Sequence, residues 1–240
     1  MTMITRPVSA AVHVLVLSVL ISAQSAGAVE FHKKLIEHGW DMPTPTFIRD
    51  NVREMEKRPF DGVVLKLEGG KDVLDPNPWA EADFAADLEA LGGVTWERFT
   101  DNFIAIGAAT TQDWFNDQHW QAIEHNVRLI GKAARVGGCV GVCLDPKAYK
   151  GVNPWSYADA AHHDTKSFEE YQTVVRRRGG QFMRALEQEL PGAKILNLWM
   201  LSGLARFVVY WEPDELVDQK FGLLPSFFNG MLGAAGPDVV

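Results

Sequence analysis

The chain has 240 residues, of which 47% are hydrophobic and 22% charged, the composition of an ordinary globular protein. Its formal net charge of −8 argues against a nucleic-acid-binding protein, which would carry a basic face. The length suits one large domain or two small ones.

The N-terminal segment, residues 1–28, is predicted to be a secretory signal peptide. A basic start at Arg6 is followed by an apolar run from Ala10 to Ile21 and by an A-x-A cleavage site that ends at Ala28. The apolar run is too short to span a bilayer. We therefore expect a mature chain that begins at Val29, is secreted or periplasmic, and has no membrane association after cleavage.

After the leader, short apolar runs alternate with amphipathic segments. The segment KKLIEHGWD predicts a first strand that ends at Trp40-Asp41, and a helix begins near Pro45. A second strand is predicted from Val63 to Leu67. This strand–helix–strand unit implies a parallel pair with a right-handed crossover.

The same alternation continues through the rest of the chain. Further strands are predicted in NFIAIGA, CVGVCLD and AKILNLWML. A helix in QHWQAIEHNVRLIGKAARVGG separates the third strand from the fourth, and a long helix over residues 168–190 separates the fourth from the fifth. The last residues, PDVV, resemble the opening of a sixth strand.

This pattern predicts an α/β protein with a parallel sheet, closed as a (β/α) barrel or open as a doubly wound sheet. No Gly-rich phosphate loop is present, and carboxylates stand at several strand ends, where a barrel builds its active face. We therefore favour a parallel, TIM-like (β/α) barrel as a catalytic domain over residues 29–240. Since a full barrel needs eight strands, either six units suffice or the barrel is incomplete at the C-terminus, and we favour truncation.

Two cysteines, Cys139 and Cys143, are the only ones in the chain. Four residues along a strand separate them by ~13 Å, beyond the limit of about 7 Å for a disulfide. We predict that both are free core residues on one face of the fourth strand. The sequence also predicts neither a metal site nor a cofactor.

Strand-end carboxylates are the candidate catalytic residues. Asp145 ends the fourth strand before Pro146, and Asp41 ends the first. In a barrel the two would face each other across the mouth, and glycoside hydrolysis needs two carboxylates about 5–9 Å apart. Glu68 after the second strand is a third candidate. Each of the two Asp residues could instead cap the turn or helix that follows it.

The histidine pair His162-His163 offers a further catalytic candidate. His162 could serve as a base or activate a water molecule, because a histidine titrates near neutral pH. Adjacent histidines point in different directions, which disfavours a metal site. A solvated loop is the alternative interpretation.

Aromatic residues after the strands predict a surface for sugar binding, because aromatic rings stack on the apolar faces of sugars. Eight tryptophans are present. The candidate substrate-binding residues are Trp40, Tyr149, Trp155, Tyr157 and Trp211, together with Lys66, which could hold a negative partner. Core packing is the alternative for the aromatic residues, and an edge position is the alternative for Lys66.

Two segments carry a resemblance to a known group. GWDMPTPTFIRDNVREMEKRPFDGVVLKL and CLDPKAY…NPWSY, within residues 35–157, resemble exported bacterial glycoside-hydrolase-like (β/α) barrel proteins. The resemblance implies sugar hydrolysis. In that group an acidic residue is expected directly after the Asp-Pro pair, whereas this chain has Lys147. Asp41 with His162 or His163 is also similar to the Asp–His pair of inverting sialidases.

The sequence therefore predicts a secreted glycoside hydrolase that acts on a poly- or oligosaccharide through two strand-end carboxylates. A non-catalytic carbohydrate-binding protein on the same scaffold is one alternative. A metal-dependent hydrolase that uses His162 and His163 is the other.

Overall fold

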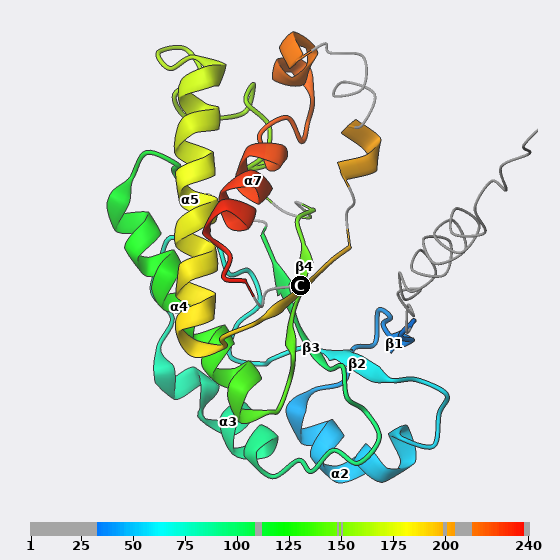
Figure 1. Ribbon diagram of the computed structural model, residues 1–240. Coiled ribbons are helices and arrows are strands. Elements are labelled where there is room, and N and C mark those ends of the chain that lie inside the picture. The colour runs from blue at the N-terminus through cyan, green and yellow to red at the C-terminus, as the bar shows by residue number, and fades with distance from the viewer. Residues whose placement is uncertain are drawn as a thin grey trace, which may run out of the picture. The chain divides into compact units, whose positions relative to one another are not determined.

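A computed structural model describes residues 33–108, 112–147, 149, 151–198, 201–204 and 213–237 (Figure 1). Residues from Lys34 onward form one compact unit. The predicted signal peptide lies outside the described residues. Among the helices that are described, none is both long and apolar enough to cross a membrane.

The described strands form one parallel sheet in the order β1-β2-β3-β4-β5. The strands are β1 (Ile36–Glu37), β2 (Gly62–Leu65), β3 (Phe103–Gly107), β4 (Gly141–Asp145) and β5 (Lys194–Asn197). Neighbours in the sheet are thus also neighbours in the sequence. Consecutive right-handed crossovers in such a sheet all pass on the same side.

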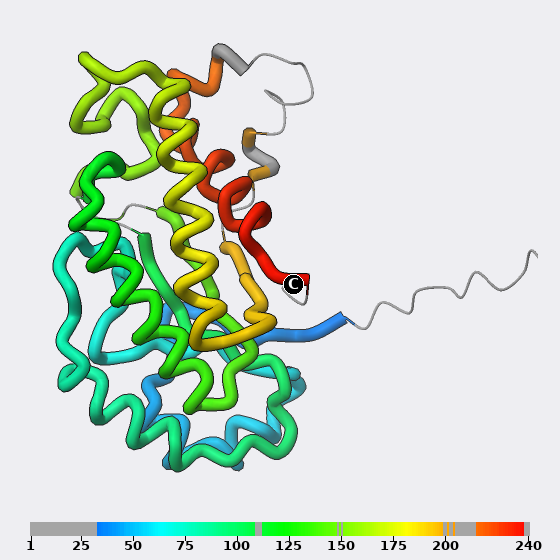
Figure 2. Tube along the Cα trace, turned by 60° about the vertical axis from the view of Figure 1, so that its left-hand side comes forward, coloured from blue at the N-terminus to red at the C-terminus, as the bar shows by residue number. Residues whose placement is uncertain are grey.

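A helix connects each pair of consecutive strands. These helices are α2 (Pro45–Met55), α3 (Ala85–Gly92) after the short η1 (Glu81–Phe84), α4 (Asp117–Val136) and α5 (Phe168–Glu189). Short helices η2 (Leu201–Leu204) and η3 (Pro213–Asp218) follow β5, and α7 (Leu224–Ala234) ends the described fold. In both ribbon and tube views α4 and α5 lie side by side and α7 lies along α5 (Figures 1 and 2).

Local sequence signals explain where helices α2 and α5 begin. The Thr44 side chain accepts a hydrogen bond from the third residue of α2, and Pro45 opens that helix. At the start of α5, Ser167 and Glu170 form a reciprocal capping box, which satisfies two backbone N–H groups. Along a helix such as α4, the buried residues recur at helical spacing, for example Trp120, Ile123 and Val127.

Each strand has two different faces because side chains alternate along it. In β4, Val142 and Leu144 belong to the large core between the sheet and the helices. Cys143 belongs to a small second cluster with Val64 and Ala105. The partly buried residues around this second cluster come from strands and loops. We call this side the second face of the sheet.

The prediction of a barrel is wrong. In the described chain β1 pairs only with β2 and β5 only with β4, so the sheet remains open. Closure of a barrel requires eight strands with a matching tilt and stagger, and five strands in sequential order make a parallel half-barrel. The expected α/β class and parallel pairing agree with the structure. A sixth strand at PDVV falls mostly outside the described residues.

Some predicted elements differ in extent or in face. The first strand covers only Ile36–Glu37 and does not reach Trp40-Asp41. Both cysteines are free and buried, as predicted. They do not share a face, however, because Cys139 precedes β4 and packs in the large core, whereas Cys143 lies in the second cluster.

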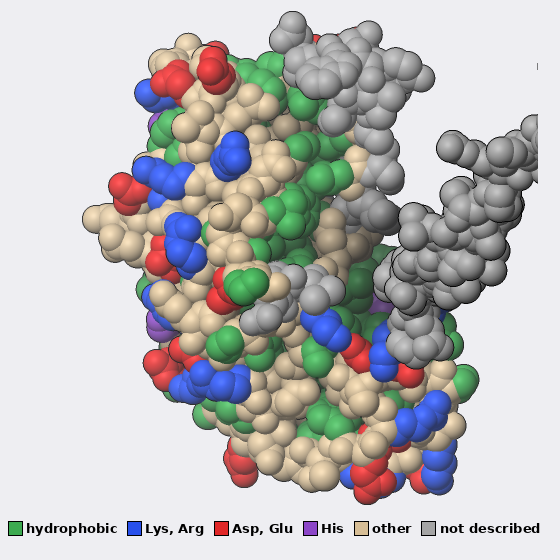
Figure 3. Space-filling view, in the orientation of Figure 1, with side chains coloured by type: hydrophobic (Ala, Val, Ile, Leu, Met, Phe, Trp, Pro, Cys, Tyr) green, Lys and Arg blue, Asp and Glu red, His purple; other side chains and the backbone are tan. Residues whose placement is uncertain are grey.

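An ion-paired cluster joins the sheet at the amino-terminal ends of its strands. Asp101, just before β3, accepts hydrogen bonds from Lys194 at 2.7 Å and from Thr100 at 2.8 Å. The Nζ of Lys34, a residue just before β1, lies 3.1 Å from Asp101 Oδ2, the oxygen that also accepts the Thr100 hydroxyl. Lysines at the starts of the two edge strands thus converge on Asp101 at the start of the middle strand. Acidic and basic side chains are interspersed over the face visible in Figure 3, around a central band of hydrophobic side chains.

Candidate functional site

A cavity of about 860 Å³ lies at the carboxyl ends of the strands, on the second face of the sheet. Lys66 follows β2, Asp145 ends β4 and Leu198 follows β5, and all three line this central cavity. His38, which follows β1, also lines it. These residues continue the alternation that places Val64 and Cys143 on the second face.

Asp145 is held in place by two hydrogen bonds. Its Oδ1 accepts the backbone N–H of Lys147 at 3.1 Å, and its Oδ2 accepts the hydroxyl of Tyr149 at 2.8 Å. The hydrogen bond from Lys147 closes the turn after β4, as expected for a turn cap. Asp145 therefore caps this turn and also lines the cavity. The hydrogen bond from the Tyr149 hydroxyl to Asp145 raises the pKa of Tyr149, and burial and the negative charge of Asp145 add to the effect. Tyr149 therefore stays protonated and acts as a donor.

A second carboxylate, Asp72, lies on the other side of β3. Asp72 forms a single parallel bridge with Gly107, and Gly107 pairs with Asp145 on its other side. A Cβ added at Gly107 would lie 2.4 Å from Asp72 Oδ1, so a glycine is needed for this carboxylate to reach over the strand. The backbones of Asp72 and Asp145 are two strand spacings apart, and Asp72 Oδ1 lies over Gly107 between them. The two carboxyl groups are therefore between one and two strand spacings apart, or roughly 5–10 Å.

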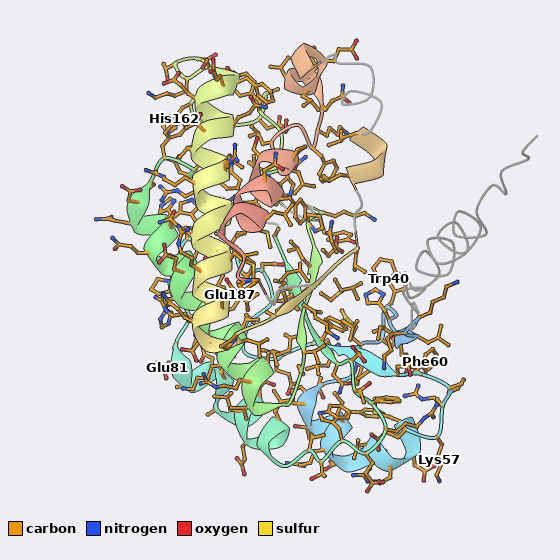
Figure 4. The ribbon with its side chains drawn as sticks, viewed as in Figure 1. Trp40, Lys57, Phe60, Glu81, His162 and Glu187 are labelled. Atoms are coloured by element: carbon orange, nitrogen blue, oxygen red, sulfur yellow. The ribbon has the colours of Figure 1, made fainter. Side chains whose placement is uncertain are left out.

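Two exposed aromatic side chains border the cavity. Trp40 is 90% exposed and Tyr149 is 56% exposed, and both line it. Figure 4 shows Trp40 beyond the β1 edge of the sheet, away from the helices. Exposed aromatic rings with a polar group at one end are suited to stacking on sugars.

The central cavity continues into neighbouring hollows on two sides. A hollow of about 520 Å³ shares His38, Trp40 and Met42 with it. Another of about 610 Å³ shares Lys147 and Tyr149. The three together form an extended groove, in which the two exposed aromatic residues stand where one hollow passes into the next.

The thiol of Cys143 also lines the central cavity. Burial, and secondarily the charge of Asp145, raises the pKa of Cys143 to about 12. Since the thiolate is the nucleophilic form of cysteine, this residue is poorly suited to act as a nucleophile at neutral pH.

The other predicted catalytic residues lie elsewhere. Asp41 lines the 520 Å³ hollow and not the central cavity. Glu68 stands in a turn whose backbone N–H groups, from Glu68 and Gly69, donate to the buried carboxylate of Asp87 at 2.9 Å. The chain has left β2 by this point, so Glu68 does not line the central cavity.

His162 lies at the far end of the molecule from Trp40, beside the start of α5 (Figure 4). Its Nε2 is 3.0 Å from Asp113 Oδ2, and its ring packs edge-on against Phe115. The neighbouring His163 pairs with Asp164 instead. The structure therefore does not bring His162 together with Asp145 in the central cavity.

The other predicted aromatic platforms are part of the packing. Trp155 is fully buried, and its Nε1 donates to the carbonyl of Pro146 at 2.6 Å. It therefore anchors the Asp-Pro turn to the core and offers no exposed face to a sugar. The hydroxyl of Tyr157 donates to the carbonyl of Lys166 at 2.7 Å, which fixes the loop before α5. Trp211 lies outside the described residues.

Sequence reasoning missed several residues of the central cavity, namely His38, Lys71 and Asp72, and assigned no role to Lys147. Strand alternation could have identified His38, two residues beyond Ile36 on the same face. No sequence signal connects Asp72 with Gly107, because their bridge joins an irregular segment to a strand 35 residues away.

Across the described residues, no three His, Cys, Asp or Glu side chains are grouped so that they could hold a metal ion. Comparisons of the chain with protein-family models, curated proteins and solved structures find no match. The functional argument therefore rests on the geometry of the central cavity.

Proposed function

We propose that the protein is an exported glycoside hydrolase that cleaves an oligosaccharide or polysaccharide in the central cavity. The observation that carries the proposal is the pair of carboxylates, Asp145 and Asp72, that line one cavity on either side of Gly107. Their separation, roughly 5–10 Å from the strand spacing, includes the separations of about 5–9.5 Å that glycosidases use. Trp40 and Tyr149 would supply stacking surfaces for the sugar rings on either side of the reacting bond.

The two carboxylates have different surroundings, which suggests different roles. Asp145 is half-buried and accepts two hydrogen bonds, which fix the direction of its oxygens. Such a fixed carboxylate is suited to act as the base or nucleophile at the anomeric carbon. Asp72 is exposed at the rim of the sheet and would protonate the leaving oxygen.

The test is hydrolysis of a panel of oligosaccharides and polysaccharides by the full chain, measured as the release of reducing ends. Asp145→Asn and Asp72→Asn should each lower kcat at least about 10²-fold, the usual contribution of a general acid or base. Asp41→Asn is the matched control, because it changes a nearby carboxylate that lines the 520 Å³ hollow and not the central cavity. Circular dichroism checks that each variant is folded.

Hydrolysis that survives both Asp145→Asn and Asp72→Asn in folded proteins would refute this site. A folded chain that binds sugars in the cavity but releases no reducing ends would favour the non-catalytic carbohydrate-binding protein. The anomer of the first product separates retention from inversion.

A further inference from the structure

Three lysines line the central cavity, namely Lys66, Lys71 and Lys147. All three are exposed. Within the described residues, none of them forms an ion pair with a carboxylate, although Asp72 and Asp145 line the same cavity. The cavity therefore holds more positive than negative side chains.

This arrangement runs against the charge of the chain as a whole. Asp and Glu total 31 against 23 Lys and Arg, so a carboxylate partner is abundant for any surface lysine. Five other lysines of the described chain do have such a partner: Lys34, Lys57, Lys132, Lys166 and Lys194. A group of unpaired lysines gathered in one cavity of an acidic protein is a feature that a negatively charged ligand would explain.

The lysines also follow one part of the groove. Lys66 stands at the end of β2, Lys71 next to Asp72, and Lys147 at the passage into the 610 Å³ hollow. Lys220 lines that second hollow together with Lys147, and it too makes no ion pair in the described structure. In the 610 Å³ hollow the two lysines outnumber one carboxylate, Asp159, whereas the 520 Å³ hollow is acidic, with Glu37, Asp41 and Glu54 beside Arg58. The excess of positive charge therefore extends from the central cavity into the 610 Å³ hollow, and not along the whole groove.

We propose that the substrate is an acidic carbohydrate chain, whose carboxylate or sulfate groups are held by Lys66, Lys71 and Lys147. The inference deepens the proposed function and rests on it for the identity of the site. Sugar rings would stack on Trp40 and Tyr149 while the lysines hold the charged groups of successive units. A lysine ammonium acts as a point charge with three hydrogen-bond donors, so it can bind either a carboxylate or a sulfate.

The test measures equilibrium binding by calorimetry, which is independent of hydrolysis. The probes are an oligouronate, a sulfated oligosaccharide and a neutral oligosaccharide with the same backbone as the oligouronate. We expect at least one acidic probe to bind more tightly than the neutral one, with an affinity that falls as salt is added. Lys66→Met, Lys71→Met and Lys147→Met should each weaken binding about threefold to fivefold, as for loss of an exposed ion pair.

Lys132→Met is the matched control, because Lys132 is a partly exposed lysine on α4 that is paired with Glu81 and lies outside the groove. Lys66→Arg should retain tight binding, since it keeps the charge. The inference is overturned if neither acidic probe binds more tightly than the neutral one, or if the three cavity variants bind as Lys132→Met does. Tight lysine-dependent binding without cleavage would leave this inference standing and refute the hydrolase, whereas cleavage of neutral sugars alone would do the reverse.

Discussion

Asp101 provides the sharpest test of how the half-barrel is held together. Its carboxylate is 8% exposed and lies in contact with Lys194, Lys34 and Thr100. Burial alone would raise the pKa of Asp101, but the hydrogen bonds from Lys194, Thr100 and Lys34 outweigh it and lower the pKa to about 2. The perturbation we choose is Asp101→Asn, which keeps the shape of the side chain and removes its charge.

The magnitude follows from the difference between the folded and unfolded pKa values. The carboxyl falls from an ordinary value of 3.8 to about 2, and each unit corresponds to about 1.4 kcal/mol. The charge of Asp101 therefore contributes about 2 kcal/mol to the free energy of unfolding at neutral pH. Because the folded pKa is the lower one, this contribution is present above about pH 4 and is lost as the pH falls toward about 2.

The assay is urea unfolding followed by circular dichroism, at a series of pH values from 7 to 2. The free energy of unfolding of Asp101→Asn should lie about 2 kcal/mol below that of the unchanged chain at pH 7, and the gap should close between pH 4 and pH 2. Asp50→Asn is the control, because Asp50 is an exposed carboxylate paired only with its neighbour Arg49. A gap that does not change with pH, or no gap at pH 7, would refute the reasoning.

Two further predictions concern the strands that line the cavity. Gly107→Ala should change the free energy of unfolding by less than about 1 kcal/mol but lower hydrolysis, because the added Cβ meets only the movable carboxylate of Asp72 at 2.4 Å. Gly141→Ala should lower the free energy of unfolding by about 3 kcal/mol, since its Cβ would lie 1.8 Å from the backbone carbonyl of Lys194. Urea unfolding of both variants, together with a hydrolysis assay of Gly107→Ala, measures these effects. Equal losses of stability in the two variants would contradict the prediction. Burial is the main cause that raises the pKa of Cys139 and of Cys143 to about 12. Because only the thiolate reacts, both residues should be alkylated at pH 8 about 10³-fold more slowly in the folded chain than in urea. Mass spectrometry after iodoacetamide treatment measures this, and modification of the native chain at the rate of the unfolded one would show that the thiols are accessible.

Much of the fold could be predicted because the elements are encoded locally. Apolar runs such as FIAIG and GVCLD marked β3 and β4, and helical spacing of apolar residues marked α4 and α5. The closure of the sheet could not be predicted in this way, because it depends on which strand edges pair across the sheet. β1 shows the same limit, since the strand was predicted over KKLIEHGWD but only Ile36 and Glu37 pair with β2.

The candidate site was predictable where it depends on the end of a single strand. Asp145, Lys66 and Trp40 were identified in this way, and the structure brings them to one cavity. Trp155 could not be placed, because a tryptophan after a strand serves equally as a sugar platform or as an anchor, and only its bond to the carbonyl of Pro146 distinguishes the two. Asp72 was missed because it joins the site through its bridge with Gly107, a contact between distant parts of the chain.

The predicted pairing of Asp145 with Asp41 depended on the closure of the barrel, but the predicted place of Asp145 at a strand end did not. In an open doubly wound sheet a ligand binds where the strand order reverses, but the order here is sequential and has no such point. All crossovers of a sequential sheet pass on one side, so the second face stays available for a ligand, as the interior mouth is in a barrel. Carboxyl ends of parallel strands meet at one edge in either case. Asp145 and Asp72 therefore flank Gly107 at that edge because of strand direction and side-chain alternation, which an open half-barrel and a closed barrel have in common.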